Sequence, residues 1–182
     1  HPTALLLIDV QQSFVHRPYW SAADVPAFLD KTNTLVAGAV ARGVPVVRIL
    51  HVGDSEFSHA SGHVRPLDGL MPFDAAATFE KRRHSALVGT GLPVWLHEHG
   101  ISRLIVAGIR TEQCCETTAR HASDEGWAVD YVTEATLTFD MSTPGGERLT
   151  AAQIRERTAT VLAGRFATLC SVEEALQRTS AP

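Results

Sequence analysis

Short apolar runs alternate with longer amphipathic segments along this chain. Four runs have the length of buried strands, and a fifth is weaker. They are Thr3–Val10, Val44–Leu50, Arg103–Ala107, Trp127–Val132 and, the weakest, Phe166–Leu169. The first and third runs are apolar at consecutive positions, as in strands that are covered on both faces. The pattern therefore predicts a sheet buried between two layers.

Helical patterns fill most of the intervals between these runs. Asp24–Arg42 carries apolar residues three or four positions apart, and Gly43 follows it as a helix-ending glycine. Ser171 stands three residues before Glu174, which is the spacing of a capping box. The other predicted helices are Leu92–His99, Thr111–Glu125, Thr150–Gly164 and Ser171–Arg178.

Strand–helix alternation with short connections is typical of an α/β fold. We expect one domain over residues 1–182, built as three α/β/α layers around a mostly parallel central sheet. The longest irregular stretch, Gly53–Phe79, mixes His, Ser, Gly, Pro and Asp. A loop of that length in a compact domain is usually functional, so we interpret it as a lid.

Composition excludes several classes of protein. Hydrophobic residues make up 45% of the 182 residues and the net charge is −4, which excludes a disordered chain. A mildly acidic chain is also a poor phosphate-backbone binder, so no nucleic-acid partner is expected.

Location is predicted from three further features. No apolar run reaches the ~18 residues that a membrane helix needs, and no signal peptide is recognisable at the start. Two of the three cysteines, Cys114 and Cys115, are adjacent, and the third is Cys170, so a disulfide framework is not expected. These features favour the cytoplasm.

Chemistry in parallel sheets lies beyond the carboxyl ends of the strands, and three polar residues there stand out. Asp9 ends the first apolar strand, and Cys114 falls in the first turn of the helix after the third. A helix N-terminus is expected to lower the pKa of a thiol there. Lys81 lies in a basic run, and most such runs are solvated surface patches. Any single cysteine is ordinarily a small core residue. Together they would supply a nucleophile, a base and a cation.

Three motifs carry a resemblance to a known superfamily. LLLIDVQQSF (Leu5–Phe14) is an apolar strand followed by Asp-x-Gln-x-x-Phe, and KRRHSAL (Lys81–Leu87) resembles a Lys-x-x-x-Ser-Ala-Phe segment. The third, LIVAGIRTEQCCETTARHASDEGW (Leu104–Trp127), resembles Gly-x-x-Thr-x-x-Cys-Val-x-x-Thr-Ala-x-x-Ala. In this order and spacing they resemble the isochorismatase-like cysteine hydrolases, which include nicotinamidases, N-carbamoylsarcosine amidohydrolase and ureidoacrylate amidohydrolases.

The resemblance implies a set of roles. Asp9, Lys81 and Cys114 match the base, the charge stabiliser and the nucleophile, and the backbone N–H groups of Arg110 and Cys114 match the oxyanion hole. It also implies a non-proline cis peptide around Ile109, Arg110 and Thr111. The expected substrate contacts are Phe14, Trp20 and His84.

The implied activity is hydrolysis of the C–N bond of a small amide, carbamoyl or ureido compound through a thioester. Two alternatives stay open: vinyl-ether hydrolysis of the isochorismatase type, and a non-catalytic small-molecule-binding protein that kept the fold. The resemblance also implies a homo-oligomer acting on a small molecule.

The chain departs from the superfamily pattern at three positions. Arg110 replaces a small or apolar residue, Cys115 a valine and Leu87 a phenylalanine. The segment His51–His63 lacks the Asp-x-His that holds a metal in nicotinamidases. We therefore expect no metal or cofactor, and interpret these histidines as loop or substrate-contact residues.

Overall fold

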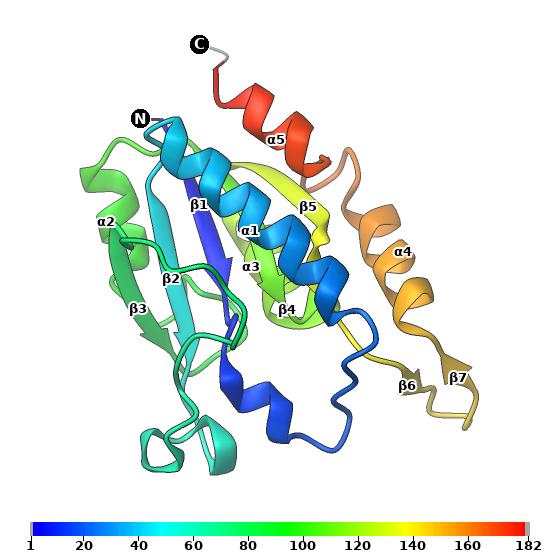
Figure 1. The fold of residues 1–182 in the computed structure, drawn as a ribbon. Helices are drawn as coiled ribbons and strands as arrows, with labels where there is room; N and C mark the ends of the chain where they lie inside the picture. The colour runs from blue at the N-terminus through cyan, green and yellow to red at the C-terminus, as the bar shows by residue number, and fades with distance from the viewer. Residues whose placement is uncertain (1, 181–182) are drawn as a thin grey trace.

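The structure is a computed structural model that describes residues 2–180. Within these residues, the main sheet has six strands in the order β3-β2-β1-β4-β5-β8, and every neighbouring pair is parallel. Figure 1 shows β1 near the middle of the sheet, between β2 and β4. The strands are β1 (Thr3–Ile8), β2 (Val46–His51), β3 (Ala77–Lys81), β4 (Arg103–Ile109), β5 (Ala128–Leu137) and β8 (Thr168–Leu169).

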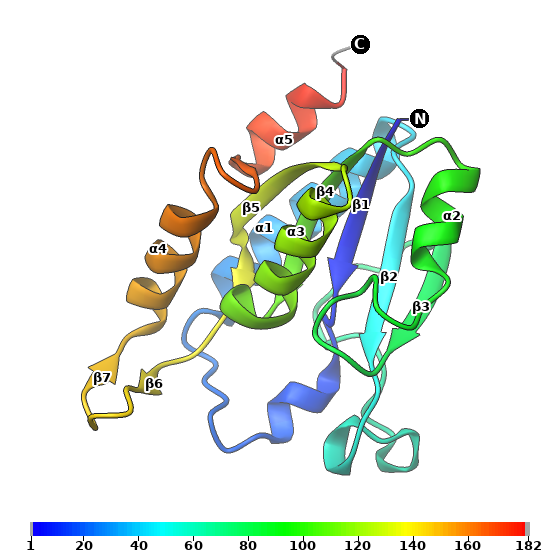
Figure 2. The same ribbon diagram turned by 180° about the vertical axis from the view of Figure 1, so that it is seen from behind.

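Helices cover both faces of the sheet, as Figures 1 and 2 show from opposite sides. They are α1 (Val25–Ala41), α2 (Leu92–Glu98), α3 (Glu116–Asp124), α4 (Ala151–Leu162) and α5 (Val172–Arg178). Side chains alternate along β1, so that Leu5 and Leu7 join the core under α1 and α5. Leu6 and Ile8 join the opposite core, with residues of α2, α3 and α4. The predicted three-layer α/β fold is confirmed.

The structure corrects the predicted elements in three places. The interval assigned to a loop, Gly53–Phe79, ends inside β3, and β5 continues five residues beyond the predicted Trp127–Val132. A short hairpin of β6 (Met141–Ser142) and β7 (Arg148–Leu149) follows β5. β3 escaped detection because it is an edge strand, whose Thr and Glu side chains are exposed between half-buried Ala and Phe.

The segment before β3 is tied to the carboxyl end of β1. It contains two short turns, η2 (Ser55–Phe57) and η3 (His59–Ser61), and β1 is followed by the turn η1 (Gln12–His16). The N–H of Gln12 donates to the carbonyl of Arg65 at 2.9 Å. This hydrogen bond holds the segment before β3 beside the end of β1, where the segment forms a wall.

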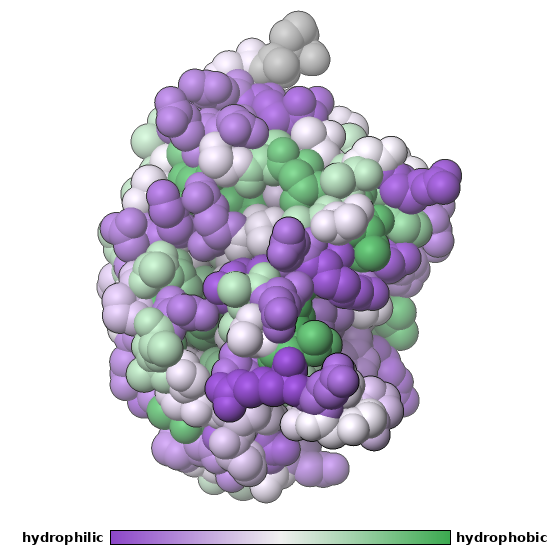
Figure 3. Space-filling view, turned by 90° about the vertical axis from the view of Figure 1, so that its right-hand side faces the viewer, coloured by the Kyte–Doolittle hydropathy of each residue, from purple (hydrophilic) through white to green (hydrophobic). Residues whose placement is uncertain are grey.

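The surface offers no continuous apolar face on the side of α4 and the β6–β7 hairpin. Figure 3 views the molecule from that side and shows hydrophobic residues scattered among hydrophilic ones. The expected homo-oligomer stays a prediction. Among the described residues, no helix is both long and apolar enough to cross a membrane.

A close approach of two backbones fixes the centre of the sheet. Gly108, near the end of β4, has φ +137°, and a Cβ on it would lie 2.0 Å from the carbonyl oxygen of Ile8. Only glycine leaves room for β1 and β4 to approach this closely at the edge where Asp9 begins.

We predict that Gly108→Ala lowers the free energy of unfolding by at least ~3 kcal/mol, because backbone atoms cannot move aside as a flexible side chain can. The measurement is urea denaturation followed by circular dichroism. The matched control is Gly89→Ala, at φ +67° with nothing within 4 Å of the added Cβ, which is expected to cost ~1 kcal/mol. Equal losses in the two variants would contradict the prediction.

Candidate active site

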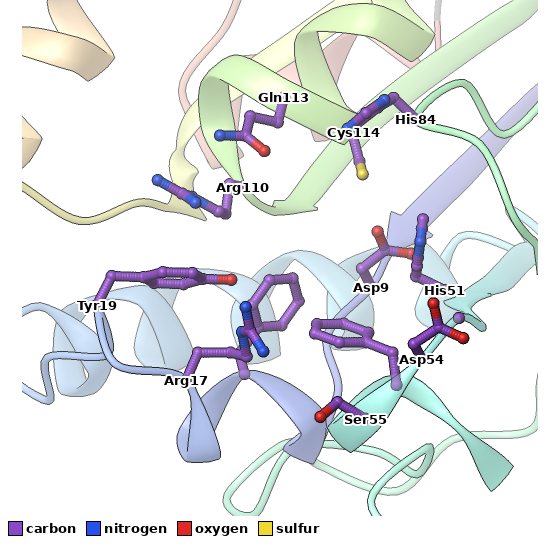
Figure 4. A pocket seen from close by; sticks show the side chains of 13 residues that line it. Asp9, Arg17, Tyr19, His51, Asp54, Ser55, His84, Arg110, Gln113 and Cys114 are labelled. Atoms are coloured by element: carbon purple, nitrogen blue, oxygen red, sulfur yellow. The ribbon is translucent and has the colours of Figure 1, made fainter. Parts of the chain in front are cut away.

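Four adjacent strands bring four polar side chains to one edge of the sheet. Lys81 is the last residue of β3, His51 is the last of β2, and Asp9 follows β1 directly. Cys114 lies in η4 (Thr111–Cys115), a π-helical turn between β4 and α3. Figure 4 shows Asp9, His51 and Cys114 together on one side of a cavity. The position is the switch point of the strand order, where ligand sites of parallel sheets lie.

The Lys81 ammonium stands at the centre of this cluster. Its side chain is fully buried, and its Nζ lies 2.7 Å from His51 Nδ1, 3.0 Å from the Arg83 carbonyl oxygen and 3.1 Å from Cys114 Sγ. Those three hydrogen bonds use its three N–H donors. Burial lowers the pKa of Lys81, but attraction by Asp9 and Cys114 outweighs that effect and raises it. The lysine is therefore a permanent buried cation and not a solvated residue.

Asp9 faces this cation directly from the end of β1. Its Oδ2 lies 3.0 Å from Lys81 Nζ as an ion pair, and neither carboxylate oxygen has a hydrogen-bond partner within residues 2–180. Burial raises the pKa of Asp9, against the attraction of Lys81. The backbone adopts φ +52°, an uncommon conformation that Asp tolerates better than most residues. Both oxygens are free to accept a proton.

The Cys114 thiol is held in its protonated form, contrary to the expectation from its helix position. Burial, and then the charge of Asp9, raise its pKa to about 12, although Lys81 acts in the opposite direction. The helix N-terminus does not dominate because the thiol is buried and a carboxylate stands in the same buried space. Attack by the sulfur would therefore require transfer of the thiol proton, and the Asp9 carboxyl lies in the same buried cluster.

His51 is a member of the cluster that the sequence did not single out. Because an ammonium can only donate, His51 Nδ1 must accept from Lys81, and the ring proton therefore lies on Nε2. Burial, followed by the charge of Lys81, lowers the pKa of His51 to about 4, so the ring is neutral at pH 7. The signal was present: His51 directly follows the apolar run Val44–Leu50 at the end of a strand.

Gln11 holds His51 in place. Its side chain accepts from the backbone N–H of His51 at 2.8 Å and donates to the carbonyl of the same residue at 2.9 Å. The amide thereby ties the segment after β1 to the last residue of β2, beyond the Ile8–Ile49 pair that ends the regular ladder. This accounts physically for a buried glutamine two positions after Asp9.

The turn that carries Cys114 is fixed from β5. The Tyr131 hydroxyl donates to the Thr111 carbonyl at 2.6 Å, and the hydroxyls of Thr111 and Thr136 are 2.7 Å apart. The peptide bond between Ile109 and Arg110 is cis, within the segment where the resemblance implies one. The roles of the Arg110 and Cys114 N–H groups as an oxyanion hole stay a prediction.

A cavity of about 300 Å³ opens onto the cluster. Phe14 and His84, two of the three expected substrate contacts, line it. Trp20 is not among the lining residues: its ring packs against Phe139, with centroids 5.3 Å apart, and the neighbouring Tyr19 faces the cavity instead. Tyr19 therefore supplies the aromatic ring at the cavity wall where Trp20 was expected.

The donor set also bears on a metal. One ligand atom each from Asp9, His51 and Cys114 lie within 4.8 Å of one another, which is compact enough for an ion. The Lys81 ammonium, however, contacts all three residues at 2.7–3.1 Å and takes the place that a divalent cation would need. These residues fit an internal ammonium better than a metal.

The fold and the cavity define an α/β protein with a small-molecule site at the carboxyl edge of a parallel sheet. The family model of the Isochorismatase domain matches residues 3–174, and the chain belongs to this hydrolase family. A putative hydrolase of the family from Chromobacterium violaceum ATCC 12472 has a similar structure. The TM-score is 0.88 at 28% identity, covering 100% of this chain and 94% of that one.

Two curated relatives extend the comparison. The isochorismatase family protein YrdC of Bacillus subtilis (strain 168) is 25% identical over 174 residues, covering 94% of this chain and 92% of YrdC. The ureidoacrylate amidohydrolase RutB of Pantoea ananatis (strain LMG 20103) is 24% identical over 166 residues, covering 71% and 65%. The family thus includes amidohydrolases.

We predict that Asp9→Asn lowers the pKa of the Cys114 thiol by ~1 unit or more, because the charge that opposes the thiolate is removed. Lys81→Met, which removes the cation, is expected to raise it. The measurement is the pH dependence of iodoacetamide alkylation at Cys114, followed by peptide mass spectrometry. Thiol pKa values that move in the same direction in both variants would contradict this electrostatic assignment.

Proposed function

We propose that this protein hydrolyses the C–N bond of a small amide or carbamoyl compound through a thioester on Cys114. The observation that carries the proposal is the buried Lys81 ammonium, which contacts both the Asp9 carboxylate and the Cys114 sulfur at the end of the cavity. The amidohydrolase among the relatives supports the same class of substrate.

In the first half-reaction, Asp9 takes the thiol proton as Sγ of Cys114 forms a bond to the substrate carbonyl carbon. The carbonyl becomes an oxyanion, which the backbone N–H groups of Arg110 and Cys114 stabilise. Asp9 then returns the proton to the nitrogen of the substrate, the C–N bond breaks, and the amine leaves. A thioester remains on Cys114.

In the second half-reaction, Asp9 takes a proton from water as the water oxygen adds to the thioester carbonyl. The C–S bond breaks, the acid leaves, and Asp9 returns the proton to sulfur. Asp9 is a carboxylate again once the thioester has formed, so the negative charge that passed to the substrate oxyanion has returned beside Lys81. The cluster therefore keeps the same net charge in both states, which avoids creating an unpaired buried charge.

The test is a screen of small amides, N-carbamoyl compounds and vinyl ethers, reading ammonia or amine release and the intact mass of the protein. We expect Cys114→Ala to lower turnover of the best substrate by at least ~10³-fold, because no other group supplies the nucleophile. A covalent acyl adduct on Cys114 of the wild type is the expected intermediate.

The matched control is Cys115→Ala, which removes the adjacent, fully buried thiol on the core side of the turn. Its turnover is expected to stay near that of the wild type. Unchanged turnover in Cys114→Ala would overturn the proposal, and cleavage of vinyl ethers without any adduct would favour the ether-hydrolase alternative.

A further inference from the structure

A second polar group faces the same cavity from the side away from Asp9. Arg110 is 8% exposed and lines the cavity wall, and its guanidinium carbon lies 4.3 Å from the centroid of the Tyr19 ring. The Phe139 ring centroid is 5.6 Å from the same carbon. Two aromatic rings thus fix the plane of this guanidinium.

Within the described part of the chain, the Arg110 guanidinium donates no hydrogen bond to the protein. Arg110 Nε is buried and has no hydrogen-bond partner within residues 2–180. The nearest carboxylate, that of Glu112, is 3.8 Å from Nη2, which is an ion pair beyond hydrogen-bond distance. Glu112 instead accepts from the hydroxyl of Thr138 at 2.5 Å. A buried donor without an acceptor is costly, and an acceptor in the cavity would relieve that cost.

Arg17 adds a second guanidinium on the same wall. Its carbon is 5.9 Å from the centroid of the Tyr19 ring, and it pairs with Glu56 at 3.2 Å. Figure 4 shows Arg17, Tyr19 and Arg110 on one side of the cavity and Asp9, His51 and Cys114 on the other. The cavity is therefore polarised, with arginines at one end and the reactive sulfur at the other.

We propose that Arg110 determines substrate specificity by binding a carboxylate group of the substrate while the scissile carbonyl lies at Cys114. This inference rests on the proposed function and adds the substrate class: small amides or carbamoyl compounds that carry a carboxylate a few bonds from the reacting carbonyl.

Several features favour a carboxylate over a larger or more highly charged anion. A guanidinium fork matches a planar carboxylate. The cavity, at about 300 Å³, suits a small ligand. The Asp54 side chain also lines the wall, and together with Asp9 it would repel a dianion such as a phosphate ester. A single negative charge at the arginine end satisfies these constraints.

The test uses affinity labels that react with the Cys114 thiol without turnover. N-bromoacetylglycine and N-bromoacetyl-β-alanine carry a carboxylate at two distances from the reactive carbon, and their terminal amides are neutral partners of the same size. The second-order rate of Cys114 alkylation is measured by peptide mass spectrometry for each reagent. The ratio of the carboxylate rate to the amide rate is the readout.

In the wild type, we expect the carboxylate form of at least one reagent to react ~10-fold or more faster than its amide. Arg110→Met is expected to bring this ratio close to one. Both rates in the ratio are measured on the same variant, so a general change in thiol reactivity cancels, and circular dichroism checks that the variant is folded. Arg110→Lys should retain part of the preference. Arg42→Met, at an exposed position at the end of α1, is the matched control and should keep the wild-type ratio.

A wild-type ratio near one for both pairs, or an unchanged ratio in Arg110→Met, would overturn the inference. So would the absence of any labelling at Cys114, because the cavity would then admit neither ligand. Alkylation requires no hydrolysis, so the ratio tests Arg110 as the carboxylate contact independently of turnover. A failure to turn over any amide would overturn the proposed function and would leave the result for Arg110 standing.

Discussion

The site depends on the contacts of the buried Lys81 ammonium with Asp9, His51 and Cys114. An isolated charge in this position would be prohibitively costly, and the carboxylate of Asp9 offsets that cost. The same ammonium holds the Cys114 sulfur and fixes the tautomer of His51. One cation thus keeps the imidazole of His51 neutral and lies between the Asp9 carboxyl and the Cys114 thiol.

The fold positions that ammonium by holding the edge strand β3, and the segment after it, in place. β3 lies at the border of the sheet, where a strand has a neighbour on one side only. The segment that follows it is tied to α3, because Ser85 Oγ lies 2.7 Å from His121 Nδ1 and the N–H of Ala86 donates to Thr118. His121 is thereby used for structure. These contacts keep Lys81 against the interior although the residues after it, Arg82 and Arg83, are exposed.

The sequence was informative where a feature is local. Apolar runs and helix-ending residues gave the three layers, and the position of Asp9 and Cys114 just after strands singled them out. Properties that depend on partners across the sheet could not be read from it. The thiol pKa of Cys114 is raised by burial and by Asp9, and the His51 ring is kept neutral by burial and by Lys81, one strand away. Trp20 was expected to line the cavity, but Tyr19 lines it. The orientation of the two rings depends on how the chain turns after η1, which periodicity does not encode.

The four groups come from the ends of four adjacent strands or from the turns that follow them, and this has a consequence for how the protein reaches its native state. His51 and Lys81 are 30 residues apart in sequence, and Lys81 and Cys114 are 33 apart, so no fragment of two neighbouring elements contains the cluster. Parallel pairing closes long loops, which slows folding relative to proteins built from local contacts. Cys114 thus meets Asp9 and Lys81 only after the central sheet has formed, and the appearance of its native thiol reactivity during refolding marks completion of the sheet.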